Sequence, residues 1–178
     1  MGSIIKVNEY KDFNNNDIMT SDGSGNVTIN AAAMKNTPSF FAYADTGEEQ
    51  TLTNNTEHKI VLGGESWDTA SAFGSNKWTP GIAGTYYLYG IVYVSGDNVT
   101  ELEGCKVKIF KNGSEIASNN IDTRNGGKHY IHHLGVSVMN VANTTDYYEL
   151  YAQVLDSDNS QSGVGVESTY FMGFKIIT

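Results

Sequence analysis

The chain has 178 residues, which is enough for one domain with a sizeable core and a short appendage. Its hydrophobic fraction of 39%, with 19 Gly and 11 Tyr, is typical of an all-β protein, because helical chains are richer in Leu, Ala and Lys. The formal net charge of −9 argues against nucleic acid and anionic membranes as partners, since both require a basic protein surface.

No apolar run approaches the ~20 residues of a membrane-spanning helix, so we expect no transmembrane segment and no membrane insertion. The stretch Met1–Lys6 lacks the apolar core of a signal peptide, and we expect no Sec export. Because Cys105 is the only cysteine, no intrachain disulfide can form. Its place in an apparent strand predicts a small buried side chain.

Residues 1–36 differ from the rest of the chain in composition. A polar turn cluster at Ser21–Asn26 precedes the brief strand candidate Val27–Ile29. So little apolar surface cannot form an independent core. We therefore predict that residues 1–36 are an N-terminal arm that orders against other subunits or a larger assembly. Thr37-Pro38 would join this arm to a head domain over residues 37–178.

Residues 37–178 contain short strand candidates separated by Gly, Asn, Asp and Ser clusters, the spacing of sandwiches and jelly rolls. Asn112-Gly113 is the strongest hairpin signal, because both residues tolerate the positive φ of a type I′ turn. The expected strands, besides a central one, are Phe40–Ala44, His58–Leu62, Asn76–Trp78, Cys105–Lys111, Glu115–Ile121, His129–Val141, Tyr147–Leu155 and Thr169–Ile177. About eight to ten strands without a long helix indicate a jelly roll.

The central strand follows the turn Trp78–Gly81 and is apolar on both faces. Side-chain alternation assigns Tyr86, Leu88, Val92 and Val94 to one face, and Tyr87, Tyr89, Ile91 and Tyr93 to the other. An antiparallel strand normally has one face in water, so a strand that is apolar on both needs a second partner. A sister subunit is the simplest candidate, and a loosely covered outer face is the alternative.

Several ordered motifs resemble the C1q-like globular domain. They are Phe40, Trp67-Asp68, Phe73, Trp78–Pro80, Gly84–Leu88, Lys111–Ser114, Tyr148–Tyr151 and Phe171–Phe174. The resemblance covers about residues 37–178, and the order of the motifs makes it more specific than any one of them. Two departures are Gly90, where the family usually carries an aromatic or similar side chain, and Asn143–Asp146, where it usually has Gly-Asp.

This resemblance implies a ten-stranded C1q/TNF-like jelly-roll sandwich that assembles as a homotrimer. It places one set of apolar residues in the core of each subunit: Phe40, Tyr86, Leu88, Val92 and Phe174. It places a second set at the threefold interface: Tyr87, Tyr89, Ile91 and Phe171. Buried tyrosines contribute a large contact area and a hydroxyl that needs a hydrogen-bond partner.

The arm resembles the N-terminal stretches of small phage tail-fibre or virion appendage proteins that carry a C1q-like head. This second resemblance rests on Ser3–Val7 and Met19–Ile29. A collagen-like Gly-X-Y stalk and a signal peptide are both absent from the sequence, which favours a phage protein over a secreted animal protein.

Two groups of side chains are candidate metal ligands. His132 and His133 are neighbours on one expected strand, so they point to opposite faces and cannot both ligate one ion within a chain. A histidine near a threefold axis is repeated three times, however, and three imidazoles can hold a metal. Asp156 and Asp158 lie in a loop with the character of a calcium site, although Gln161 replaces the glycine of an EF-hand. The alternatives are hydrogen-bonded interface histidines and a solvated loop tip, with no cofactor.

No catalytic motif can be identified in the sequence. It contains no G-x-S-x-G nucleophile elbow, and its carboxylates are spread over apparent loops. We therefore expect a protein that is not an enzyme.

We predict a homotrimeric phage virion protein, a tail-fibre or appendage subunit. Its arm would bind other virion proteins, and its head would bind a host-surface receptor or glycan. Rigid scaffolds place recognition on loops, and the candidate loops are Thr46–Asn55, Ser95–Thr100, Asp122–Gly127 and Asp156–Gly163. Two alternatives remain: a purely structural virion decoration or adaptor protein, and a cellular C1q-like carbohydrate- or protein-binding module.

Overall fold

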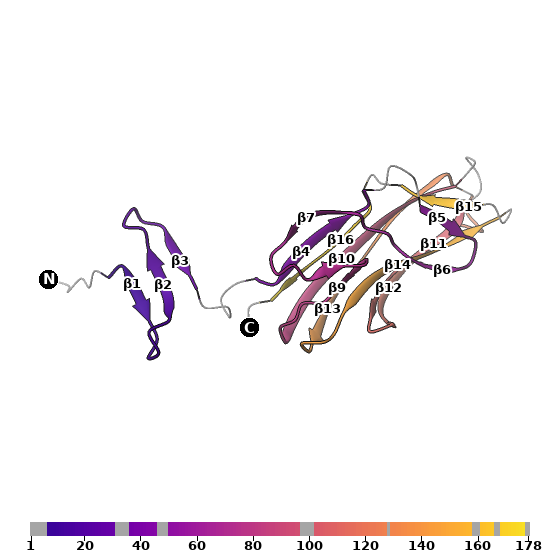
Figure 1. The fold of residues 1–178 in the computed structure, drawn as a ribbon. Helices are drawn as coiled ribbons and strands as arrows, with labels where there is room; N and C mark the ends of the chain where they lie inside the picture. Colours follow the sequence, from indigo (N-terminus) through magenta and orange to yellow (C-terminus); the bar gives the residue numbers. More distant parts are fainter. Residues whose placement is uncertain are drawn as a thin grey trace.

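The computed structural model describes residues 7–30, 36–45, 50–96, 102–127, 129–157, 161–165 and 168–176. Within these ranges all regular secondary structure is β-strand, which confirms the all-β prediction. Figure 1 shows two groups of strands: β1 to β3 near the N-terminus, and a larger head built from β4 to β16. The described part of the chain contains no helix that is long and apolar enough to cross a membrane.

The N-terminal group is a three-stranded antiparallel sheet in the order β1-β2-β3, which we call the arm sheet. Its strands are β1 (Glu9–Lys11), β2 (Asp17–Ser21) and β3 (Val27–Ile29). The head begins at β4 (Ser39–Tyr43), just after the cis peptide bond between Thr37 and Pro38. The division of the chain at residue 36 stays a proposal.

One layer of the head is a seven-stranded antiparallel sheet centred on β10. Strand β10 pairs with β13 along its whole length, and its other edge pairs with β16 and then with β15. Strands β4 and β7 continue the sheet from β16, and β5 continues it from β15. Besides β4, the strands are β5 (Gln50–Thr53), β7 (Gly64–Asp68), β10 (Gly84–Ser95), β13 (Ile131–Ala142), β15 (Gln161–Val164) and β16 (Tyr170–Lys175).

The other layer is a six-stranded antiparallel sheet in the order β12-β11-β14-β9-β8, with β6 also paired to β14. Its strands are β6 (Glu57–Lys59), β8 (Phe73–Gly74), β9 (Lys77–Trp78), β11 (Leu102–Lys111), β12 (Ser114–Asp122) and β14 (Tyr148–Asp156). Asn112 and Gly113 connect β11 to β12 with φ of 51° and 78°. The predicted tight hairpin is therefore confirmed.

The two layers enclose a hydrophobic core with an aromatic centre. The ring centroid of Phe40 lies 4.6 Å from that of Trp78 and 5.1 Å from that of Phe171. The centroids of Trp78 and Tyr86 are 5.2 Å apart, and all four side chains are buried. The Tyr86 hydroxyl donates a 2.6 Å hydrogen bond to the Ile82 carbonyl, so burial leaves this polar group satisfied.

The turn between β13 and β14 is held by the carboxylate of Asp146. This carboxylate accepts hydrogen bonds from the Asn143 backbone N–H at 2.8 Å and from Asn112 Nδ2 at 2.7 Å. Lys111 Nζ lies 2.9 Å from it. These donors, the Asn143 backbone foremost, lower the pKa of Asp146 to about 2. The four-residue turn Asn143–Asp146 is thus fixed to the β11–β12 hairpin by an ionised side chain.

Gly90 lies on the core face of β10, opposite Phe171 of β16. A Cβ atom at this position would clash with Cδ1 of Leu150, which is itself buried in β14. The glycine therefore lets the two layers pack around Leu150.

We predict that Gly90→Ala lowers the free energy of unfolding by about 1 to 3 kcal/mol, because overpacking a dense core forces neighbouring side chains out of their preferred conformations. Chemical denaturation followed by tryptophan fluorescence measures the change. Gly74→Ala is the matched control, since a Cβ atom at Gly74 would meet open space. Equal stability of the two variants would contradict the packing argument.

Candidate functional site

Strand β10 presents large apolar side chains on both faces, as its sequence predicts. Four of the five residues expected in the core are buried in it: Tyr86, Leu88 and Val92 of β10, and Phe40 of β4. The alternate residues Tyr87, Tyr89, Ile91 and Tyr93 are half-buried on the outer side of the sheet. Because the six-stranded layer covers only the inner side of this sheet, the outer side is left uncovered within the described part of the head.

We call this outer side of the seven-stranded sheet the tyrosine face. The pairing register places on it Phe41, Tyr43, Trp67, Tyr87, Tyr89, Ile91, Tyr93, His133, Ser137, Met139, Val141, Tyr170, Met172 and Phe174. Directly opposed residues in antiparallel strands share a side, which is why these residues gather. None of the residues in this set is Asp, Glu, Lys or Arg, so the tyrosine face is largely apolar across four neighbouring strands and β7, with Ser137 and His133 as polar members.

Aromatic rings form a continuous row across the tyrosine face. The ring centroids of Trp67 and Phe41 lie 5.1 Å apart, and those of Phe41 and Tyr170 lie 4.9 Å apart. The row continues to Tyr89, 5.9 Å from Tyr170. These separations are typical of favourable aromatic pairs. The row crosses β7, β4, β16 and β10, so it joins four strands into one surface.

Tyr89 occupies space that a glycine leaves free on the next strand. A Cβ atom at Gly135 of β13 would lie 2.8 Å from the Tyr89 hydroxyl oxygen. Partial burial, together with the neighbouring Tyr170 and Tyr87, raises the pKa of Tyr89. The hydroxyl is therefore neutral at physiological pH, and covering it requires no burial of charge.

Both edges of the tyrosine face are open to solvent. Met139 and Val141 on β13 are 69% and 65% exposed, and Trp67 on β7 is 47% exposed. A contiguous apolar face of this kind is unusual on a monomeric protein, where water would contact it directly. It is typical of a surface that another protein covers.

Two residues of β16 have the opposite roles to those predicted from the sequence. Phe171 lies opposite Gly90 and is buried in the core, so its prediction as an interface residue is wrong. Phe174 lies opposite Tyr87, half-buried on the tyrosine face with ring centroids 5.5 Å apart, so its prediction as a core residue is also wrong. The pairing with β10 decides which side each residue faces, and β16 alone does not reveal this pairing.

The sequence analysis did not identify Met139, Val141 and Trp67 as part of this surface. Met139 and Val141 alternate with core-facing residues such as Val136 on a strand that was predicted, so side-chain parity could have found them. Trp67 offered no comparable signal, because it reaches the tyrosine face through the pairing of the short strand β7 with β4.

The two candidate histidine ligands lie on opposite faces of β13. His133 is exposed on the tyrosine face, with its ring centroid 4.7 Å from that of Tyr93. His132 is buried on the core side, with its ring centroid 5.2 Å from that of His129, and its Nε2 atom has no hydrogen-bond partner among the described residues. Burial and His129 lower the pKa of His132. Among the described residues, no three His, Cys, Asp or Glu side chains are grouped to hold a metal ion.

Asp156 is a buried residue with hydrogen-bond partners in the fold. Ser162 donates to Asp156 Oδ2 at 3.0 Å. The side chain of Asn54 accepts from the Asp156 backbone N–H and donates to its carbonyl, both at 2.9 Å. Asp156 therefore joins the end of β14 to neighbouring segments and is no part of a solvated loop tip. Asp158, the other candidate calcium ligand, lies outside the described residues.

The head has two distinct ends. Strand β10 begins at Gly84 opposite Ala142, and Ser39 at the start of β4 belongs to this base end. At the other end, Ser95 pairs with Ile131 and Gly163. We call this the loop end, and Figure 1 shows β5 and β15 there. The four loops expected to carry recognition all adjoin strands that start or stop at the loop end.

We predict that His132→Leu makes the stability of the head less dependent on pH. Because the folded state lowers the pKa of His132, unfolding takes up a proton as the pH falls below the ordinary value of 6.5, and wild-type stability is lost through this range. Melting temperatures at pH 7.5 and pH 5.0 test this. The variant should lose less stability than the wild type between these pH values, and equal losses would contradict the assignment.

Comparison with solved structures identifies the fold. The chain is similar to the globular domain of zebrafish complement 1qA, with a TM-score of 0.50 and 14% identity over 78% of this chain and 97% of that one. It is also similar to the tumour necrosis factor Eiger from S. frugiperda, with a TM-score of 0.53 and 8% identity over 78% and 91%. No protein-family model and no curated protein matches the chain. The fold is therefore the all-β C1q/TNF-like jelly roll.

Proposed function

We propose that the protein is a homotrimeric binding module in which the tyrosine face forms the contacts between subunits. The observation that carries the proposal is the face itself, a row of neighbouring aromatic rings bordered by the exposed Met139 and Val141. Its residues lie on the regular strands of a rigid sheet, so the surface is formed before association and little ordering is needed on binding.

Burial of the tyrosine face supplies the driving force for association. Removing apolar surface from water contributes roughly 25 cal/mol per Å². Aromatic residues and a charge-depleted centre are characteristic of the buried part of protein interfaces. Each chain has a net charge of −9, but the tyrosine face has no acidic side chain among its described residues. The subunits can therefore approach without repulsion at the point of contact.

A closed threefold arrangement agrees with this surface and with the fold. The resemblance to the C1q-like domain implies a homotrimer, and the structural likeness supports the same fold independently of sequence identity. Closed cyclic symmetry covers the tyrosine face of every subunit, whereas an open head-to-tail arrangement would continue as a fibre.

The two ends of the head give the proposed trimer a direction. The chain enters the head at the base end through Ser39, and the arm sheet precedes this point. The four candidate recognition loops adjoin the loop end. In a trimer the three arms would thus be on one side and the three sets of loops on the other, which suits a protein that is anchored by one end and binds with the other.

We further propose that the trimer is a phage virion protein, a tail-fibre or appendage subunit, and that it acts by binding without catalysis. Its arm would attach to other virion proteins, and its loop end would bind a receptor or glycan on the host surface. The resemblance of the arm to virion appendage proteins supports this setting. Three identical sites on one trimer gain affinity through avidity even when each contact is weak.

We predict that Met139→Lys prevents trimer formation while leaving the subunit folded. Met139 is 69% exposed in the single chain, so the substitution costs little in the monomer, but in the trimer it would bury an unpaired charge. Light scattering measures the mass, and far-ultraviolet circular dichroism reports the fold. The added positive charge makes the net charge of −9 less negative, so dissociation cannot be attributed to greater overall repulsion.

Tyr151→Lys is the matched control for this experiment. Like Met139, Tyr151 lies on the outer side of a sheet, but it belongs to the six-stranded layer; it is a half-buried aromatic residue with its ring centroid 4.4 Å from that of Phe110. This variant should remain trimeric. A trimeric Met139→Lys protein, or a monomeric Tyr151→Lys protein, would contradict the assignment of the tyrosine face to the interface.

We predict that the purified wild-type trimer binds intact host cells, and that the monomeric Met139→Lys variant binds them about 100-fold more weakly or worse, because avidity is lost. Fluorescently labelled protein and flow cytometry measure this binding. A trimer that binds other virion proteins but no cells would contradict host attachment and favour a structural decoration or adaptor. Binding to cells unrelated to a phage host would favour a cellular C1q-like module.

A further inference from the structure

The arm sheet has one apolar and one polar face. Tyr10, Met19 and Ile29 lie directly opposite one another on β1, β2 and β3, so their side chains share a side. The other side carries Glu9 and Thr20, which are also direct partners. Side-chain alternation along these strands therefore places Tyr10, Met19 and Ile29 on one side of the sheet, and Glu9 and Thr20 on the other.

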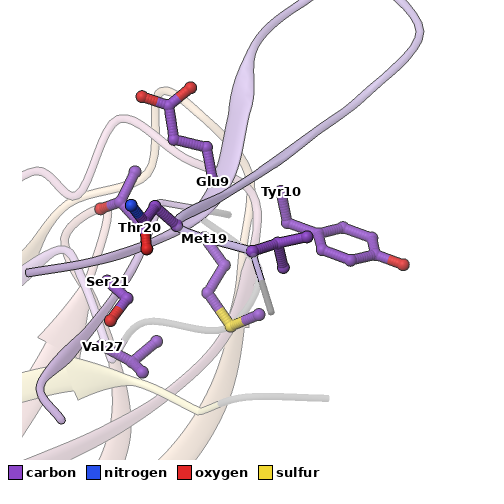
Figure 2. A pocket seen from close by; sticks show the side chains of 8 residues that line it. Glu9, Tyr10, Met19, Thr20, Ser21 and Val27 are labelled. Carbon is purple, nitrogen blue, oxygen red and sulfur yellow. The ribbon is translucent and has the colours of Figure 1, made fainter. Parts of the chain in front are cut away.

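The apolar face of the arm sheet is uncovered in the single chain. Tyr10, Met19 and Val27 are 57%, 38% and 54% exposed. Together with Val7, Asn8, Glu9, Thr20 and Ser21 they line a hollow of about 210 Å³ at the surface of the sheet. Figure 2 shows the side chains of Met19 and Val27 on the side of the sheet away from Glu9.

Both hairpins of the arm sheet are closed by the same turn, spaced ten residues apart. Asp12 Oδ1 accepts from the Asn16 backbone N–H at 2.9 Å, and Asp12 Oδ2 accepts from Asn16 Nδ2 at 2.9 Å. Asp22 and Asn26 repeat these two hydrogen bonds at 3.2 and 2.6 Å. The turns fix the order and twist of the three strands, so the sheet presents its apolar face in a defined shape.

A sheet of this size needs a partner for its apolar face. Its strands are three to five residues long, and a few short strands are stable in water only when a hydrophobic face is buried. The exposure of Tyr10, Met19 and Val27 is measured with the head present, so the head of the same chain does not cover them. The partner must therefore come from another chain.

We propose that the three arm sheets of the trimer pack their apolar faces against one another around the threefold axis and form a short stalk below the heads. This inference rests on the proposed trimer. Residues 30 to 38 connect β3 to β4 and span at most about 32 Å when fully extended, so assembly of the heads holds the three arms at a local concentration in the millimolar range.

The distribution of charge favours the same occupant. The described apolar face presents no ionised group at Tyr10, Met19, Val27 or Ile29, so three copies can meet without like-charge repulsion. The ion pairs of the arm sheet, Lys11 with Glu9 at 3.3 Å and Lys11 with Asp17, join residues of the exposed rim and polar side. Packing of the apolar faces leaves these groups in water.

Cross-linking of adjacent cysteine variants of the full chain tests the stalk. Val27→Cys places a thiol on the apolar face, and Thr28→Cys places one on the polar face, with both positions exposed. The native Cys105 is buried, which raises the pKa of its thiol to about 12 and keeps it unreactive. With a short bis-maleimide, Val27→Cys should form covalent dimers at least 10-fold faster than Thr28→Cys, at a rate that does not change when the trimer is diluted.

Light scattering on the same samples separates failure of the stalk from failure of the trimer. A trimeric mass with equal cross-linking of the two variants would overturn the stalk, would favour a virion protein as the partner of the arm, and would leave the proposed function standing. A monomeric mass would overturn both. Met19→Lys gives an independent reading: amide exchange over residues 8–29 should become faster while the mass stays trimeric, and unchanged exchange would contradict the stalk.

Discussion

Strand β10 has apolar side chains on both faces, and water must be excluded from each of them. The inner face is covered by the six-stranded layer, where Tyr86, Leu88 and Val92 join the aromatic centre around Trp78. The outer face of β10 is part of the tyrosine face, and no element of the described head lies over it. The fold of a single chain thus excludes water from the inner face of β10 and leaves the outer face uncovered. We propose that further copies of the chain cover this outer face.

The same requirement recurs on a smaller scale in the arm sheet. There, Met19 and its neighbours form an uncovered apolar face on short strands, much as the tyrosine face is an uncovered apolar surface on the head. If one threefold axis runs through both, each apolar surface of the chain has a partner in the trimer. The loop end of the head, at the far end of β10 from Ser39, is then left for a target outside the assembly.

Much of this architecture can be predicted from the sequence, and the exceptions have physical reasons. Alternation within a long strand assigns the faces of β10, and Asn112-Gly113 identifies the β11–β12 hairpin, because each signal is local. The roles of Phe171 and Phe174 are set by the register between β16 and β10, which depends on residues about eighty positions apart. The hydrogen bonds of Asp156 likewise involve Asn54, which is 102 positions away, besides the nearby Ser162, so its segment resembles a solvated loop when read alone.

The solution mass of the 178-residue chain, measured by light scattering with and without chelator, is the most direct test of the proposed homotrimer. If the tyrosine face holds three subunits together, the mass is three times the 19.4 kDa of the chain in both buffers, because buried apolar surface is not affected by a chelator. A trimer that dissociates with chelator would mean that a metal ion, and not the tyrosine face, supplies the decisive contact. A monomer in both buffers at micromolar concentration would contradict the account, since the tyrosine face would then be stable in water without a partner.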